Sequence, residues 1–271
     1  MTVLPRKLQR YGLELLIVFL GVSLSLLAEN WRQTRADAKS ESASLVRLHG
    51  DMQLDAQDMR LNASNAETGL EAARWLTANG GTKHSADSVS AMLTNIGVCS
   101  FFVPYTSEYT ALKSSGRLSL ISNDAIREGI VRLYEEQPFL EWLHERDCLM
   151  TSDLIDSLVG RFEFAEPLPQ RRGTTRYPRI LFHDGQEALL RDPVLQGQLV
   201  RLATQRQYLR DQIQRRVTSM DRLRTLIRTE LGSDTTELNT PRGGRGRQGA
   251  FRPQNDTTRS GVPSTTDSVG R

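Results

Sequence analysis

The chain has 271 residues, 38% of them hydrophobic and 25% charged, and a formal net charge of +3, which is a small basic excess rather than a strongly cationic balance. Two cysteines exclude a framework held by several disulfides, although one bridge stays open. Aromatic residues make up only 6%, so a core has to be built mainly from aliphatic side chains. That composition favours a helical protein over a β-sandwich.

The first predicted element is an apolar segment over residues 11–31, in which Glu14 is the only charged residue between Tyr11 and Ala28. A helix over residues 11–28 spans about 27 Å, close to the hydrocarbon core of roughly 30 Å. Tyr11 and Trp31 stand at its ends, where aromatic side chains anchor a span at the membrane interfaces. The segment therefore predicts a single transmembrane helix.

Two other interpretations of this segment stay open. The uncharged part from Leu15 to Ala28 has the length of the apolar core of a cleaved signal peptide. Cleavage is disfavoured because Leu26 occupies the −3 position relative to Ala28, and the Ala-x-Ala at 36–38 lies beyond two arginines. A buried helix of a soluble protein is the third possibility.

The basic residues that flank the span indicate its orientation. Three Lys/Arg residues lie in the short basic N-terminus, residues 1–10, and three follow Trp31 within a comparable distance. The N-terminal group is denser and adds the terminal amine, so the rule that positive flanks stay inside favours a cytoplasmic N-terminus. The bulk of the chain is then expected outside the cytoplasm.

One face of the predicted span carries a candidate packing site. Glu14, Gly21, Ser25 and Ala28 follow one another at spacings of seven, four and three, so they share one side of a helix. Small residues at such spacing allow a second helix to approach closely. We expect either another copy or a partner span on this face; alternatively, Glu14 simply extends to the near interface.

Two long amphipathic helices are predicted in the remaining chain. The first continues from the span to Asn79, where "NGG" ends it, and the second covers about 186–231 with a kink or delayed start at Asp192-Pro193. In both, apolar residues recur every three or four positions. The first apolar stripe is Leu45, Leu48, Met52, Ala56, Met59, Ala63, Ala66, Leu70, Ala73 and Leu76. The second is Leu195, Leu199, Leu202, Leu209, Ile213, Val217, Met220, Leu223, Ile227 and Leu231.

Shorter helices are expected between the two long ones. They cover 85–96, about 106–114, a segment capped by Ser122 and ended by Pro138, and 139–159. Gly116 is predicted to have positive φ, as the C-cap residue that turns the chain between two short elements. Residues 161–185 read as a long irregular connection, and "RLSLIS" is the one weak strand signal. Residues 32–232 thus predict an elongated antiparallel helical bundle in the extramembrane part.

The C-terminal segment 233–271 is rich in Gly, Arg, Thr, Ser and Pro and is expected to be a disordered tail. We expect no nucleic-acid binding. The weak alternative is that "RGGRGR" at 242–247, which resembles arginine-glycine segments of RNA-binding proteins, binds RNA.

Catalytic, cofactor and metal motifs are not found in the sequence, and no cofactor is expected. His144 and Cys148 lie four apart on one predicted helix, but two ligands do not make a structural zinc site. Tyr109 and Lys113 have the spacing of the short-chain reductase pair, yet no glycine-rich βαβ unit precedes them. The sequence therefore predicts a protein that is not an enzyme.

Two stretches resemble a widespread bacterial family of uncharacterised single-span membrane proteins. The first carries Glu14, Gly21 and Asn30-Trp31. The second runs from Tyr109 through a Leu-x-x-Ser-Gly motif that ends at Gly116, then Ile-Ser-Asn at 121–123 and Tyr134. The resemblance covers about residues 10–160. It implies a single-span protein of the bacterial inner membrane with a helical extramembrane domain, and it implies no activity.

The favoured functional hypothesis is a non-enzymatic scaffold or accessory protein that acts through helix–helix contacts. Because only about ten residues precede the span, a signal that crosses the membrane would pass through a partner, either a second copy or another membrane protein. The alternative is a ligand-sensing helical domain, which requires an apolar pocket with a few convergent polar groups. An envelope hydrolase would instead need a cleft with perturbed acids or an activated nucleophile.

Overall fold

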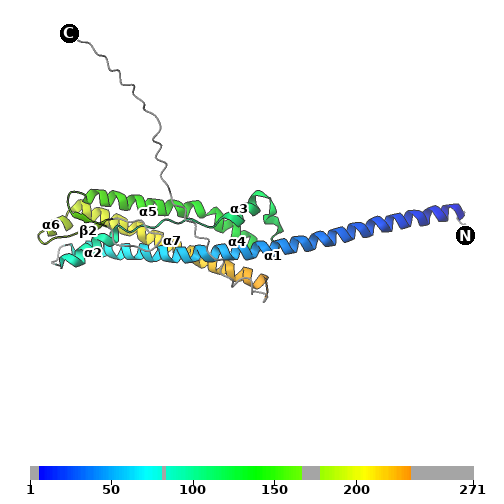
Figure 1. Cartoon of the computed structure of the whole chain (residues 1–271), viewed down its shortest axis with the longest axis horizontal. Coiled ribbons are helices and arrows are strands. Elements are labelled where there is room, and N and C mark those ends of the chain that lie inside the picture. Colours follow the sequence, from blue (N-terminus) through cyan, green and yellow to red (C-terminus); the bar gives the residue numbers. More distant parts are fainter. Residues whose placement is uncertain (1–5, 81–83, 167–177, 233–271) are drawn as a thin grey trace, which may run out of the picture. The chain divides into compact units, whose positions relative to one another are not determined.

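A computed structural model describes residues 6–80, 84–166 and 178–232, with side chains from Leu15 onward (Figure 1). The helices are α1 (Arg6–Asn79), α2 (Ala86–Ile96), α3 (Ser107–Ser114), the 3-10 helix η1 (Arg117–Leu120), α4 (Asp124–Glu135), α5 (Gln137–Leu158), α6 (Glu187–Leu190) and α7 (Pro193–Glu230). The strands are β1 (Glu163–Ala165) and β2 (Arg179–Leu181). The predicted all-α class is confirmed for these residues. The expected tail over 233–271 lies outside them.

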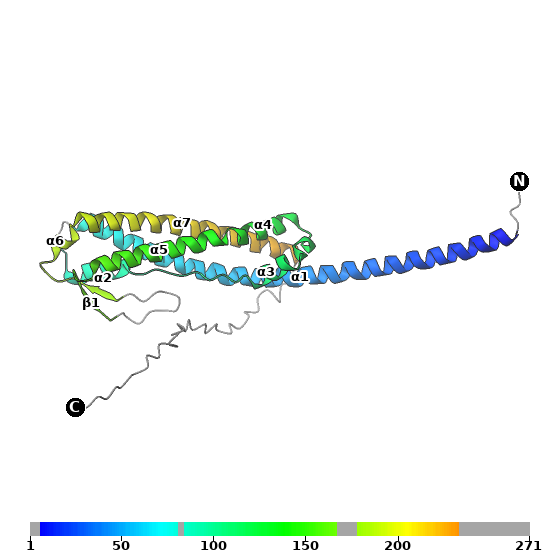
Figure 2. The same ribbon diagram turned by 90° about the horizontal axis from the view of Figure 1, so that it is seen from above.

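The two long helices α1 and α7 lie side by side (Figures 1 and 2). Two ion pairs show that they run in opposite directions. Arg60 of α1 pairs with Asp221 of α7 at 2.6 Å. Glu67, which is later in α1, pairs with Arg210, which is earlier in α7, also at 2.6 Å. The first pair is exposed and contributes little stability, the second is part-buried, and both mark the register of the two helices.

The apolar stripes of the two helices supply the main contact. Leu48 and Met52 of the first stripe and Leu209 and Ile213 of the second are buried, each at most 3% exposed, as expected if the two predicted stripes pack together. With about 1.5–3 kcal/mol for each large apolar side chain removed from water, the two stripes dominate the energetics of the packing.

The buried side chains form two clusters along this pair of helices. One cluster joins the middle of α1 and the C-terminal half of α7 to α3, α4 and the start of α5. The other joins the end of α1 and the start of α7 to α2, α6, β2 and the end of α5. The first cluster lies toward the end from which the N-terminal part of α1 extends away from the other helices (Figures 1 and 2).

The element boundaries agree with most of the local signals. α1 ends at Asn79, as the glycines predict, and Pro193 delays the start of α7, with Asp192 Oδ1 accepting a hydrogen bond from the Val194 N–H at 2.8 Å. Gly116 has φ 69° between α3 and η1, which confirms the predicted left-handed turn, although the C-cap residue of α3 is Ser115 and Gly116 follows it.

Three local predictions are wrong. The N-cap of α4 is Asn123, not Ser122; its Oδ1 accepts from the N–H groups of Ala125 and Ile126. "RLSLIS" forms η1 rather than a strand. The connection expected to be irregular contains β1 and β2, paired antiparallel with Phe164 opposite Ile180. Residues 167–177 of that connection lie outside the described part.

Candidate functional site

The N-terminal part of α1 contains a stretch that is long and apolar enough to cross a membrane, and it is the one such helix in the described part of the chain. Its large side chains are exposed along the whole stretch; Leu15 is 74% and Phe19 is 68% exposed. Contiguous apolar surface of this extent is rare on soluble monomers, because each square ångström left in water costs about 25 cal/mol. The stretch therefore has the length, composition and exposure of a membrane-spanning segment.

The candidate packing face lies on this stretch without a protein neighbour in the described residues. A Cβ added at Gly21 would meet nothing within 4 Å, and Ser25 and Ala28 are exposed. The Ser25 hydroxyl donates to the Gly21 carbonyl at 2.9 Å, so its polar group is satisfied within the helix. Glu14 and Tyr11 belong to α1, but their side chains lie outside the described part.

Polar and aromatic groups follow the apolar stretch. Trp31 is 60% exposed, and the guanidinium of Arg35 lies 4.0 Å from its ring centroid. Arg32 pairs with Glu29 at 2.6 Å on the same turns. A tryptophan next to arginines is the composition of a membrane interface, as the sequence predicts for this end of the span.

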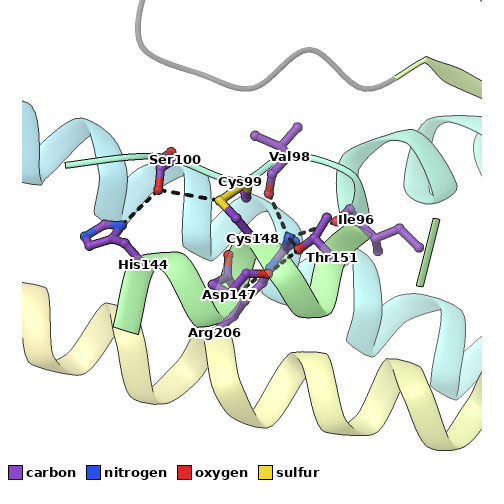
Figure 3. A network of polar contacts seen from close by, with 9 residues as sticks. All are labelled: Ile96, Val98, Cys99, Ser100, His144, Asp147, Cys148, Thr151 and Arg206. Carbon is purple, nitrogen blue, oxygen red and sulfur yellow. Dashed lines mark hydrogen bonds and ion pairs between the residues drawn. A yellow bond between two sulfur atoms is a disulfide. The ribbon is translucent and has the colours of Figure 1, made fainter. Parts of the chain in front are cut away.

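A buried arginine connects three helices further along the chain (Figure 3). Arg206 of α7 is 0% exposed, and its Nε lies 3.3 Å from Oδ1 of Asp147 on α5. Its Nη2 lies within 2.9 Å of three oxygens: the carbonyls of Ile96 and Val98 and the hydroxyl of Thr151. Burial raises the pKa of Asp147, and the nearby arginine opposes that rise. Nε and Nη2 of Arg206 are thus bonded inside the core, whereas its Nη1 is buried without a hydrogen-bond partner among the described residues.

A disulfide lies beside this arginine. Cys99, in the segment between α2 and α3, is bonded to Cys148 of α5, with Cα atoms 5.3 Å apart. His144, one turn before Cys148, places Nδ1 3.0 Å from the Ser100 carbonyl, and burial lowers its pKa. The segment after α2 is thus attached to α5 by a covalent bond and to α7 through the carbonyls that Arg206 binds.

A second set of buried charges lies in the other core cluster. Asp55 of α1 accepts a hydrogen bond from the Tyr105 N–H at 3.0 Å, and its burial raises its pKa to about 7. Arg216 of α7 donates to Oε1 of Gln137 at 3.0 Å and pairs with Glu136 at 3.6 Å. Burial lowers the pKa of Arg216, so this guanidinium is incompletely compensated.

The two pairs considered from the sequence have structural roles. Cys148 is bonded to Cys99, so it cannot act with His144 as a metal ligand. Tyr109 and Lys113 both bind Oε1 of Glu135, and burial together with that carboxylate raises the pKa of Tyr109 to about 12. Within the residues that the structure describes, no group of three His, Cys, Asp or Glu side chains is placed to hold a metal ion.

The buried charges were not predicted, although the sequence carries a signal for them. Arg206 follows Leu202 by four residues and precedes Leu209 by three, so it occupies a position of the apolar stripe. Arg216 occupies a later position of the same stripe on α7. Asp147 occupies an equivalent position among the apolar residues of α5. A charge at a stripe position is expected to be buried and paired, whereas charges on the opposite face of an amphipathic helix are expected to be solvated.

Comparison with protein-family models, with curated proteins and with solved structures finds no match for this chain.

Proposed function

We propose that this chain is a single-pass membrane protein whose extramembrane helices act as a scaffold through protein contacts, without catalysis. One observation carries the proposal: α1 is a single uninterrupted helix, Arg6–Asn79, that contains both the exposed apolar stretch and one long side of the packed core. A contact made in the membrane is therefore connected by continuous helix to the elongated antiparallel bundle outside it.

The disulfide supports an extracytoplasmic position for this bundle. Bridges such as Cys99–Cys148 persist in oxidising compartments and are rare in the cytoplasm. The denser basic group at residues 1–10 points to the same orientation. Together with the resemblance of the two sequence motifs to a bacterial single-span family, these features support the inner membrane of a bacterium as the location.

The buried charges are better explained by fold specificity than by chemistry. Arg206 and Asp147 are almost fully removed from solvent and bind each other, and Arg206 also donates to backbone carbonyls. A catalytic group has to reach a substrate from a cleft, which neither side chain does. The proposal therefore assigns these residues to holding the helices in one arrangement.

The test of the scaffold proposal is a cross-linking scan of the full-length protein in native membranes. Single cysteines replace each residue from Leu15 to Leu27, and a bis-maleimide reagent is added. Cys99 and Cys148 are consumed by the disulfide and need no replacement. Cross-linking to a second copy or to one discrete partner is expected to peak at Gly21 and Ser25 and to fall at Phe19. A flat profile around the helix would contradict contact through this face.

Orientation is tested separately with an impermeant thiol reagent on intact cells. A Thr2→Cys variant is expected to stay unlabelled, whereas a Ser260→Cys variant in the C-terminal segment is expected to be labelled. The reverse pattern would place the bundle in the cytoplasm.

A second candidate function, a ligand-sensing domain, is favoured by one specific observation. A groove of about 500 Å³ lies between α4, the start of α5 and α7, with an apolar floor and several converging arginines. This size falls within the roughly 300–1,000 Å³ of small-molecule sites. A sensor would bind its ligand there and pass the change along α1 and α7 to a partner.

A further inference from the structure

The groove between α4, α5 and α7 has two chemically different parts. Its buried floor is apolar and includes Leu133, Leu140 and Leu223. Phe139 and Leu226, both about half exposed, continue this surface to the rim. The other lining residues are mostly polar: Arg132, Glu136, Gln212, Arg215, Arg216, Ser219 and Arg222, with Ala125 and Gly129 completing the wall.

The polar part carries an excess of positive charge. Four arginines face one carboxylate, that of Glu136, so the lining has a net charge of +3. Three of the arginines, Arg132, Arg215 and Arg222, have exposed side chains and no acidic partner within the described residues. The less exposed Arg210 and Arg224 of α7 are paired with acids, whereas the exposed Arg201 outside the groove has no ion pair within the described residues. The groove thus keeps guanidinium groups available for an anion.

Arg216 adds a buried positive charge at the base of the groove. Its side chain is 7% exposed, and its Nε is buried without a hydrogen-bond partner among the described residues. Glu136, its acidic partner, is 3.6 Å away and largely exposed. A buried guanidinium that is paired only at this distance favours a further negative charge nearby.

We propose that this groove binds a single-chain anionic amphiphile, with a carboxylate or phosphate head on the arginines and an alkyl chain on the leucine floor. A small inorganic anion would leave the apolar floor uncovered, and a neutral lipid-like molecule would leave the arginines unpaired. Both halves of the groove are used only by a molecule that carries both chemistries. This proposal rests on the second candidate function, ligand sensing, and names the class of ligand. It does not depend on the helix–helix contacts of the scaffold proposal.

Binding is measured on the full-length protein in nanodiscs of zwitterionic lipid. A Ser219→Cys variant carries an environment-sensitive fluorophore at the groove, because the native cysteines are bonded and do not react. Dodecyl phosphate, inorganic phosphate and dodecyl maltoside are titrated below the concentrations that dissolve the discs. We expect a saturable change with dodecyl phosphate, none with inorganic phosphate and a much weaker one with the maltoside. A fluorophore at Thr204→Cys, outside the groove, reports uptake into the bilayer alone.

Groove variants identify the binding groups. Because Arg215 and Arg222 are exposed and unpaired, Arg215→Gln and Arg222→Gln are each expected to weaken dodecyl phosphate binding about tenfold. Arg201→Gln makes the same charge change on an exposed position of α7 outside the groove and should leave binding unchanged. Leu226→Ser should weaken binding, whereas Val200→Ser, also about half exposed, should not.

Four results would overturn the proposal. An equal response to inorganic phosphate would show a simple anion site. Affinity that is unchanged in both arginine variants would exclude the arginines as head-group ligands. A response that appears only with anionic lipid in the nanodisc would assign the groove to the membrane surface. No response to any probe, confirmed with a second fluorophore at Ala125→Cys on the opposite wall, would exclude this ligand class. That result would still allow the groove to sense a ligand of another class. The sensing function itself would be contradicted if no ligand changed the cross-linking of the Leu15–Leu27 cysteines to a partner.

Discussion

Exchange of Gly69 for alanine tests whether the buried guanidinium of Arg206, which bonds α7 to α5 and α2, is also packed closely against α1. Gly69 is in the interior of α1, where a change from Gly to Ala ordinarily stabilises a helix by about 1 kcal/mol. A Cβ at this position would lie 1.6 Å from Nη1 and 2.6 Å from Cζ of Arg206. These distances are too short for any contact, so the guanidinium would have to leave its site.

The magnitude follows from what that displacement breaks. Arg206 would lose the ion pair with Asp147 and the hydrogen bonds to the carbonyls of Ile96 and Val98, all within the core. Removing one partner of a buried ion pair costs about 3–5 kcal/mol. After the helix gain of about 1 kcal/mol is subtracted, Gly69→Ala should lower the free energy of unfolding by about 2–4 kcal/mol.

The assay is urea unfolding of the full-length protein in a neutral detergent, followed by far-ultraviolet circular dichroism. Gly50→Ala is the matched control in the same helix; a Cβ there meets nothing within 4 Å, so this variant should gain about 1 kcal/mol. In an Arg206→Met background the obstacle is removed, so Gly69→Ala should become neutral or stabilising. If Gly69→Ala behaves like Gly50→Ala in the otherwise unchanged protein, the close packing of Arg206 against α1 is refuted.

Three further predictions concern stability. Reduction of the Cys99–Cys148 bridge, which closes a sequence separation of 49 residues, should lower the free energy of unfolding by about 4 kcal/mol, measured by comparing oxidised and reduced protein. Burial raises the pKa of Asp55 to about 7, so the folded state holds this proton more tightly than the unfolded state does. The resulting contribution to the free energy of unfolding is complete below the ordinary carboxyl pKa and is lost as pH rises through 7. Asp55→Asn should therefore remove a decline of up to about 4 kcal/mol between about pH 4 and pH 8, and an unchanged pH profile would contradict the buried carboxyl. Gly116→Ala should cost about 1 kcal/mol through its left-handed backbone alone, since a Cβ there meets no atom within 4 Å; an unchanged melting temperature would be inconsistent with this turn.

The long helices could be predicted because their signal is local and repeated. Ten stripe positions on each of two segments indicate the helical period many times over, so single exceptions do not change the result. The elements that were missed depend on distant residues. Ser122 and Asn123 are both acceptable N-cap residues, and the choice is decided by Glu41 of α1, whose carboxylate accepts from the Ser122 N–H and hydroxyl.

The short strands were missed for the same physical reason. Each has three residues, too few for an alternating pattern to be recognised. β2 is held by α2, where the hydroxyls of Thr94 and Ser90 accept hydrogen bonds from the N–H groups of Ile180 and Phe182. Such bonds join residues more than 80 positions apart and leave no mark in the local sequence. The groove is likewise a product of packing, because its arginines come from two helices that only the fold brings together.

The continuity of α1 also fixes a rotational phase between the exposed apolar stretch and the helices that pack further along the chain. In a helix each residue turns the chain by about 100° and advances it by 1.5 Å. One residue inserted after Trp31 would therefore rotate every feature of the bundle by about 100° relative to Gly21 and Ser25, while raising it only slightly. Seven inserted residues would restore the original direction to within about 20° and raise the bundle by about 10 Å. If function depends on the rotational orientation of the groove relative to Gly21 and Ser25, the insertion of seven residues should preserve function. The insertion of one residue should abolish it.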